Sequence, residues 1–169
     1  MDEETQISGA NPAWDTDRVG GRANCSNVVV AAELRRRGIQ CVAAPRLAGR
    51  DVTEIASVWE KDGNPVNVIP IFSPRVFDDP SSSPTRAEIV ESINGYPDGS
   101  SGSMSVAWMS GGSHIFTWRK ENGKVKFLEG QTTTVDPESY FGQTVGHVFI
   151  LRMDDAEFVG NIDEWVRPV

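Results

Sequence analysis

The dipeptide Asn122-Gly123 constrains this chain more than any other feature, because it is typical of a type I′ turn that joins two antiparallel strands directly. Residues 114–120 and 124–128 flank the turn, and both stretches have the composition of strands. A two-residue loop pairs Glu121 with Lys124 and so fixes which residues face each other along the hairpin. The sequence therefore predicts a hairpin of defined register.

The predicted register places a carboxylate and an amide on the same face as a histidine. His114 pairs with Gln131, and Glu129 pairs with Phe116, which lies on the His114 face two residues further on. Either Glu129 or Gln131 can accept a hydrogen bond from the imidazole and fix its orientation, which is the role of the third member of a catalytic triad. A three-residue loop would reverse this parity, so the inference depends on the turn.

Residues 24–38 carry the clearest helix signal in the chain. Asn24 is a suitable N-cap, and an apolar face follows over residues 28–34. Three arginines at 35–37 suit the negative end of the helix dipole, and Gly38 is a natural residue just beyond a helix end. We expect a buried helix here.

Cys25 is the candidate nucleophile, because it falls in the first turn of that helix. The dipole and the free amides there favour a thiolate, the reactive form of cysteine. The backbone amides of Asn24 and Cys25 are candidate donors to an oxyanion. The alternative is that Cys25 is a small buried residue at a helix end with no chemistry. Cys41 falls in the middle of a predicted strand, where we expect a buried and inert thiol.

His114 is the candidate base, because a thiolate needs a nearby imidazole to pair with it and to protonate the leaving amine. It follows the Gly111-Gly112 loop, which leaves a side chain accessible at the start of a strand. The alternative is a surface histidine on a strand edge. His147 competes for the role, but it lies within the apolar stretch 145–153, which favours a structural position.

The remaining signals complete an α+β pattern, with a front helix, a variable middle and a largely antiparallel sheet. A capping box joins Thr85 to Glu88 at the start of a second helix, which Asn94-Gly95 ends. Further strands are predicted at 39–44, 104–109 and 145–153, helical turns at 52–59, 136–141 and 161–167, and loops at 78–84 and 97–103. We expect residues 1–23 to form an irregular arm and residues 24–169 a single domain that carries the candidate catalytic residues.

Composition excludes several classes of function. The formal net charge of −8 repels phosphate backbones, so we expect no nucleic-acid partner. No apolar run is long enough to cross a bilayer, and the N-terminal stretch lacks the features of a signal peptide. The only zinc-type ligands are two cysteines and two histidines without the usual spacing, so we expect neither a metal nor a cofactor.

At this point the chain resembles the papain-fold toxin family, which comprises glutamine-deamidase-like domains of bacterial polymorphic toxins. The resemblance lies in residues 24–38, in 112–116, in the hairpin 122–132, and in 139–141 and 151–154. These pieces keep their order and span residues 12–165 loosely, while the middle of the chain is unmatched.

The resemblance implies a papain-like α+β fold, in which the helix carrying the nucleophile packs on an antiparallel sheet. It implies that Cys25 is the nucleophile and His114 the base. The family's third member is usually an aspartate fifteen residues after the histidine, and here that position holds Glu129. Gln131 is the alternative third member. Some relatives carry a second cysteine where this chain has Val28.

The resemblance also implies a function and its setting. We expect a cysteine-dependent amidohydrolase that deamidates a glutamine side chain of a target protein as a secreted toxin effector. Delivery by a larger toxin into the cytoplasm of a target cell, and a cognate immunity protein as partner, follow from the same resemblance. The alternatives are a papain-like protease, which needs the same residues, and a catalytically silent binding domain or phage accessory domain.

Overall fold

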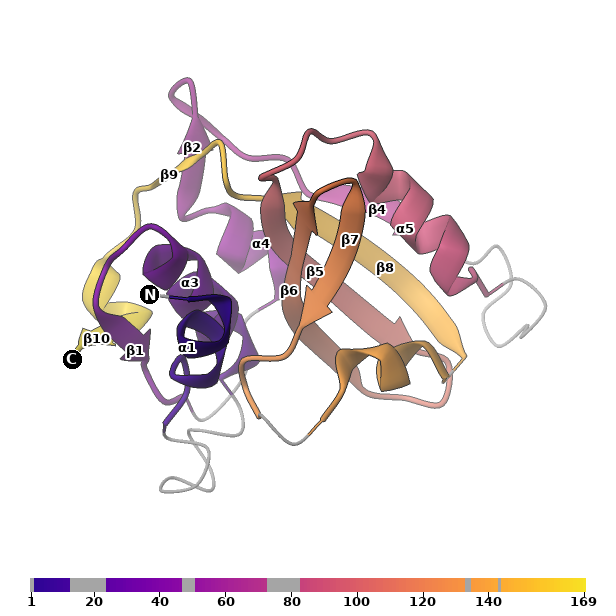
Figure 1. The fold of residues 1–169 in the computed structure, drawn as a ribbon, viewed down its shortest axis with the longest axis horizontal. Helices are drawn as coiled ribbons and strands as arrows, with labels where there is room; N and C mark the ends of the chain where they lie inside the picture. The colour runs from indigo at the N-terminus through magenta and orange to yellow at the C-terminus, as the bar shows by residue number, and fades with distance from the viewer. Residues whose placement is uncertain (1, 13–23, 47–50, 73–82, 133–134, 143) are drawn as a thin grey trace.

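A computed structural model describes residues 2–12, 24–46, 51–72, 83–132, 135–142 and 144–169. Its centre is a five-stranded sheet in the order β4-β8-β5-β6-β7, in which all neighbours are antiparallel. The strands are β4 (Ile69–Phe72), β5 (Ser101–Trp108), β6 (Ser113–Glu121), β7 (Lys124–Leu128) and β8 (Val145–Arg152) (Figure 1). The predicted strands 114–120, 124–128 and 145–153 therefore share one sheet.

The turn between β6 and β7 confirms the predicted register. Asn122 and Gly123 both have positive φ, at 51° and 74°, as a type I′ turn requires. The ladder runs from the pair Glu121–Lys124 to the pair Thr117–Leu128. Because β7 ends at Leu128, the predicted pairs Phe116–Glu129 and His114–Gln131 are not formed, and residues 129–131 continue beyond the ladder.

Helix α3 (Cys25–Arg36) packs against β6 and β5, as the sequence predicts for a helix that begins at residue 24. Its residues Val28 to Leu34 are buried, and Gly38 follows the helix with φ of 89°. Asn24 occupies the N-cap position, but its side chain does not cap the helix. The expected side-chain cap is therefore wrong, because the Asn24 side chain instead bonds to Asn11, Ala44 and Gln131.

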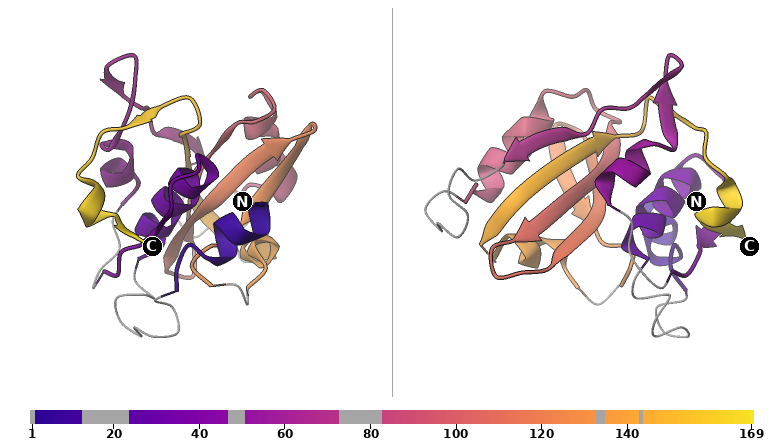
Figure 2. Two further views of the ribbon diagram at one scale, coloured as in Figure 1. Left: turned by 60° about the vertical axis from the view of Figure 1, so that its left-hand side comes forward. Right: turned by 180° about the vertical axis from the view of Figure 1, so that it is seen from behind.

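The sheet separates two hydrophobic cores. Alternate residues of β6 illustrate the division, since Ile115 packs in the core with α3 whereas Phe116 and Trp118 pack in the core with α5 (Arg86–Asn94). Figure 2 shows the two helices on different sides of the sheet. The predicted capping box is present at the start of α5, with Thr85 and Glu88 bonded reciprocally.

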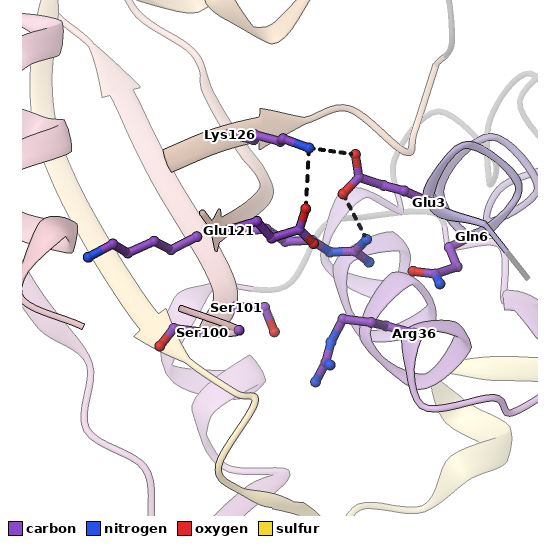
Figure 3. A pocket seen from close by; sticks show the side chains of 10 residues that line it. Glu3, Gln6, Arg36, Ser100, Ser101, Glu121 and Lys126 are labelled. Atoms are coloured by element: carbon purple, nitrogen blue, oxygen red, sulfur yellow. Dashed lines mark hydrogen bonds and ion pairs between the residues drawn. The ribbon is translucent and has the colours of Figure 1, made fainter. Parts of the chain in front are cut away.

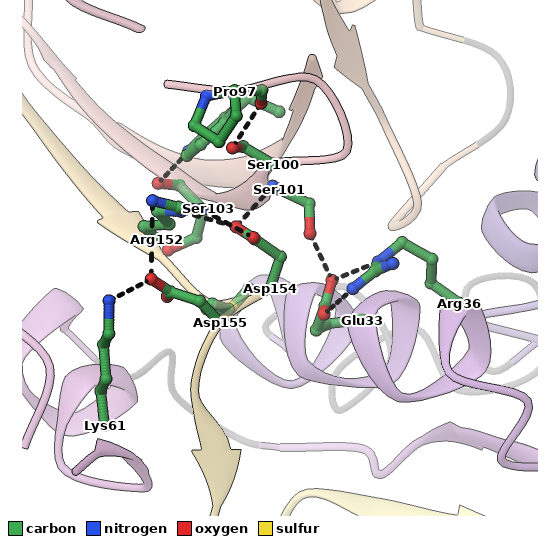
Figure 4. A network of polar contacts seen from close by, with 12 residues as sticks. Glu33, Arg36, Lys61, Pro97, Ser100, Ser101, Ser103, Arg152, Asp154 and Asp155 are labelled. Carbon is green, nitrogen blue, oxygen red and sulfur yellow. Dashed lines mark hydrogen bonds and ion pairs between the residues drawn. The ribbon is translucent and has the colours of Figure 1, made fainter. Parts of the chain in front are cut away.

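A buried carboxylate fixes the second half of α3 to the sheet. Glu33 is 2% exposed and accepts hydrogen bonds from the Ser101 hydroxyl at 2.7 Å and from the guanidinium groups of Arg36 and Arg37. The backbone amide of Ser101 donates to Asp154 at 2.9 Å. This network, drawn in Figure 4, joins the helix to the first residue of β5 and to the chain beyond β8.

Two small sheets and several short helices surround this framework. The small sheets pair β1 (Cys41–Ala43) with β10 (Val166–Pro168), and β2 (Trp59–Lys61) with β3 (Asn64–Pro65) and β9 (Glu157–Phe158). The short helices are α1 (Glu3–Ser8), α4 (Val52–Ala56) and the 3₁₀ helices η2 (Pro137–Gly142) and η3 (Ile162–Glu164). No helix of the described residues is long and apolar enough to span a membrane.

Three expectations about the course of the chain need comment. Residues 1–23 do not form a wholly irregular arm, because Glu3–Ser8 fold as α1 and Ile7 and Ala10 are buried against the domain. The loop expected over 97–103 is shorter, since β5 begins at Ser101. Residues 13–23 and most of the loop predicted at 78–84 lie outside the described residues.

Candidate active site

The structure brings Cys25 and His114 together at the junction of α3 and β6. Cys25 is the first residue of α3, and His114 is the second residue of β6. Cys25 is a free and partly exposed thiol, and it forms a side-chain hydrogen bond with His114. A sulfur at a helix N-terminus, beside an imidazole, is arranged for nucleophilic chemistry.

Glu129 completes the line on the other side of the imidazole. Its Oε2 lies 2.7 Å from Nε2 of His114, and its side chain is 3% exposed. The other oxygen, Oε1, accepts the backbone amide of Gln131 at 2.7 Å. Because an ionised carboxylate only accepts, Nε2 of His114 carries the proton in this bond. The remaining ring nitrogen, Nδ1, is therefore the one available to the thiol.

The surroundings of His114 favour its charged form. Burial of the ring lowers its pKa, but hydrogen bonds to Cys25 and Glu129 and the charges of both groups outweigh burial and raise the pKa of His114 to about 9. The imidazole is thus an imidazolium at neutral pH, and such a cation stabilises an adjacent thiolate. This arrangement supplies both a nucleophile and a proton donor.

Tyr140 is a further component that the sequence reasoning missed. Its hydroxyl donates to Oε2 of Glu129, the same oxygen that His114 contacts, and its ring lies edge-on to the imidazole at 5.1 Å between centroids. Burial and the neighbouring Glu129 raise the pKa of Tyr140, so that the hydroxyl keeps its proton and acts as a donor. The sequence placed residues 136–141 in a helical turn, but nothing local indicated which strand η2 would cover.

Gln131, the alternative third member, lies in a different network. Its side-chain amide donates to Oδ1 of Asn24 at 3.5 Å, and its carbonyl accepts from Asn11 at 3.0 Å. Asn24 in turn donates to Oδ1 of Asn11 at 3.0 Å and to the carbonyl of Ala44 at 3.2 Å. These buried amides join the start of α3 to three other segments, and they occupy the Asn24 side chain. Backbone amides of the first turn remain the candidate oxyanion donors.

Cys41 and His147 lie apart from this cluster. Cys41 is 2% exposed on β1, and burial raises the pKa of its thiol. His147 pairs with Ala107, which also pairs with Ser113, the neighbour of His114. Cross-strand partners share a face, so His147 lies on the opposite face of the sheet from His114. Its ring stacks on Phe149 at 6.2 Å.

The described residues contain no group of three histidine, cysteine, aspartate or glutamate side chains arranged to hold a metal ion. What they contain is a thiol at a helix start, an imidazole on an antiparallel sheet, and a carboxylate that holds the imidazole. The helix-on-sheet architecture and this order of groups define the papain-like class of α+β folds.

The comparison with protein families agrees with that class. Residues 23–134 match the model of the family described as papain fold toxin 1, glutamine deamidase, and the chain belongs to this family. The match begins just before Cys25 and includes His114, Glu129 and Gln131. Neither the curated proteins nor the solved structures compared with the chain give a significant match.

Proposed function

We propose that this chain is a cysteine-dependent amidohydrolase that converts a glutamine side chain of a target protein to glutamate. Cys25 is the nucleophile, His114 the acid and base, and Glu129 the residue that orients His114. The observation that carries the proposal is the continuous line of hydrogen bonds from the Cys25 thiol through His114 to Glu129. The family match supports glutamine as the residue attacked.

The first half of the reaction forms a thioester. The Cys25 thiolate attacks the side-chain carboxamide carbon, and the carbonyl oxygen becomes an oxyanion that faces the first-turn amides of α3. The C–N bond then breaks as the imidazolium of His114 gives its proton to the departing nitrogen, which leaves as ammonia. Glu129 keeps the ring in the required orientation during this transfer.

The second half restores the enzyme. Neutral His114 takes a proton from water, and the resulting hydroxide attacks the thioester carbon. The C–S bond breaks, the thiolate is regenerated beside the imidazolium, and the target retains a glutamate. The sum is glutamine plus water giving glutamate plus ammonia. The same groups acting on a backbone amide would give proteolysis, which is the alternative activity.

The family's description as a toxin supports delivery of the domain into the cytoplasm of a target cell by a larger secreted protein, with a cognate immunity protein that neutralises it. Both parts of this setting belong to the proposal. The alternative of a catalytically silent binding domain has less support. In this chain Cys25 bonds to His114 and His114 bonds to Glu129, as an active site requires.

Mass spectrometry of proteins from target-cell extract tests the activity. Incubation with the native chain should convert glutamine to glutamate at defined positions, and Cys25→Ala should abolish the conversion. Cys41→Ala is the matched control and should retain it, since Cys41 lies outside the site. New peptide termini in place of conversion would establish the protease, and neither change in any extract would establish the silent domain.

A further inference from the structure

A second polar site lies at the other end of β6. The side chain of Arg119 is only 3% exposed, and the nearest carboxylate contact joins its Nη1 to Oε2 of Glu3 at 3.6 Å. The Nε and Nη2 atoms of Arg119 are buried and have no hydrogen-bond partner among the residues that the structure describes. Burying a guanidinium without hydrogen-bond partners costs free energy of folding, so an acceptor that bonded these donors would stabilise the protein.

The two unpartnered nitrogens form one edge of the guanidinium. Their N–H bonds point in the same direction, and this edge binds the two oxygens of a carboxylate or phosphate side by side. Other arginines of the described chain use the same edge in this way: Arg36 holds Glu33, Arg86 holds Glu138 and Arg152 holds Asp154. Arg119 is more buried than these arginines, yet its fork holds nothing from the described chain.

A cavity adjoins the side chain of Arg119, and because Nε and Nη2 are themselves buried, an acid group in this cavity reaches them after a rotation of the guanidinium. The cavity has a volume of about 320 Å³, and Glu3, Arg36, Lys120 and Lys126 are among the side chains that line it, together with Arg119 (Figure 3). A volume of this size admits a small organic molecule rather than a single ion.

The charge of Arg119 favours an anion in the cavity. Its lining includes Arg36, Arg119 and Lys126 together with Glu3 and Glu121, whereas the ammonium of Lys120 donates to the carbonyls of Asn94 and Tyr96. Arg36 is paired with Glu33 by two hydrogen bonds, which leaves Arg119 as the lining guanidinium whose fork has no acceptor among the described residues. Lys126 lies 3.5 Å from Glu3 and 3.3 Å from Glu121 and joins the two carboxylates at one side of the cavity.

Burial also lowers the pKa of Arg119, although Glu3 and Glu33 act in the opposite direction. The protein therefore keeps this cation in an environment that disfavours its charge. A bound acid group would supply both the missing hydrogen bonds and the missing negative charge.

We propose that this cavity binds a small molecule through an acid group with two adjacent oxygens, a carboxylate or a phosphate, held by the Nε and Nη2 fork of Arg119. The site is separate from the Cys25 thiol, since Arg119 and His114 lie towards opposite ends of β6. It does not depend on the proposed deamidase activity.

Thermal unfolding of the full chain tests the site, with inorganic phosphate and acetate as probes and sodium chloride to hold the ionic strength constant. At least one anion should raise the Tm in a saturable manner, and which anion does so identifies phosphate or carboxylate as the preferred group. Arg119→Lys keeps the charge but loses the fork, and should weaken the apparent affinity about tenfold or more. Arg86→Lys is the matched control, because its fork is filled by Glu138, and should leave the affinity unchanged.

Lys126→Met provides a second variant at an exposed position of the cavity wall, in case Arg119→Lys does not fold. It should fold normally and weaken the same anion several-fold through loss of one positive charge. The proposal is overturned if neither anion gives a saturable shift in the native chain, or if Arg119→Lys, where folded, binds as the native chain does. An affinity unchanged in Lys126→Met would also contradict it.

Discussion

Glu129 has a central place in the candidate active site, because its carboxylate contacts His114, Tyr140 and the backbone amide of Gln131. β7 ends at Leu128, so the backbone of residue 129 is no longer held in the ladder beside β6. From there the carboxylate reaches His114 at 2.7 Å. The carboxylate also accepts from Tyr140 and from the amide of Gln131, so its orientation is fixed by three donors.

Glu129→Gln should lower kcat/KM by about 10²-fold or more, because a neutral amide stabilises the imidazolium far less than a carboxylate does. In the proposed mechanism the imidazolium acts as the acid, and the pKa of His114 is about 9, so activity should fall as the pH rises through that value. Loss of the Glu129 charge lowers this pKa, and the alkaline limb of the pH–rate profile should move to lower pH. The profile on an amide substrate measures both effects.

Gln131→Ala is the companion variant for that experiment. Gln131 bonds Asn24, so its loss should lower activity less than Glu129→Gln and leave the alkaline limb in place. A Gln131→Ala chain that loses turnover, beside a Glu129→Gln chain that keeps it, would make Gln131 the third member.

Tyr140→Phe should lower kcat by about threefold to tenfold with little change in KM, since the lost hydroxyl bond acts only through Glu129. The alkaline limb should not move to lower pH, because the Glu129 charge that raises the pKa of His114 remains. The same measurement therefore separates a residue that positions the carboxylate from the carboxylate itself. Tyr96→Phe is the control, because the Tyr96 ring stacks on Trp118 away from the site. This variant should keep the kcat and the pH profile of the native chain.

At the scale of elements, the close approach of α3 to the end of β7 aligns the nucleophile with its partners. Gly130 lies between Glu129 and Gln131, and a Cβ built there would come within 2.8 Å of Cγ1 of Val28 on α3. Only glycine permits this approach without movement of the helix or of the strand end.

Gly130→Ala should therefore cost about 1–3 kcal/mol in the free energy of unfolding and lower activity, as overpacking displaces α3 from Glu129. Adding Val28→Ala removes the colliding methyl group and should recover part of both losses. Gly95→Ala is the matched control, because a Cβ there meets nothing within 4 Å and the backbone φ is −71°. Denaturant unfolding and turnover measure these effects, and additive losses in the double variant would argue against a direct collision.

The elements that the sequence could predict are those with local signals. The turn at Asn122-Gly123, the capping box at Thr85 and the helix after Asn24 each depend on a few neighbouring residues, and each is present. The predicted register also put Glu129 and Gln131 beside His114, and Glu129 does contact His114, although the ladder ends at Leu128 and the Gln131 side chain contacts Asn24 instead.

What the sequence could not predict depends on contacts between distant segments. Helix α1 has only six residues and is stabilised by its packing against α3. No local sequence pattern predicts this packing. Tyr140 reaches Glu129 because η2 folds over the end of β7, and Asn11 reaches Asn24 because the N-terminal segment crosses the start of α3. Neither juxtaposition follows from sequence spacing.

At the scale of the whole molecule, the C-terminal segment supports the beginning of α3. Trp165 is 2% exposed, and its carbonyl accepts from the amide of Ala44 at 2.9 Å. The carbonyl of Ala44 accepts in turn from the side chains of Asn24 and Asn27. The last strand is thus connected to the residue that precedes Cys25.

Trp165→Ala should cost about 3–5 kcal/mol in the free energy of unfolding, the range for a large buried aromatic side chain. It should also slow alkylation of Cys25 by iodoacetamide, since the start of α3 loses its support. Val169→Ala, at a position that is 81% exposed, should change neither quantity. Urea unfolding and timed alkylation at neutral pH measure the two effects, and unchanged alkylation in a destabilised but folded Trp165→Ala chain would show that the connection is not functional.

The pairing of β1 with β10 has a consequence for how this chain is synthesised. Residues 41–43 find their partners only at 166–168, so this ladder cannot close until residues 166–168 have left the ribosome. During synthesis, Cys25, His114 and Glu129 therefore all exist before the C-terminal segment that supports the start of α3 is complete. The supported form of the candidate active site therefore arises only after residues 166–168 have been synthesised and have paired with β1.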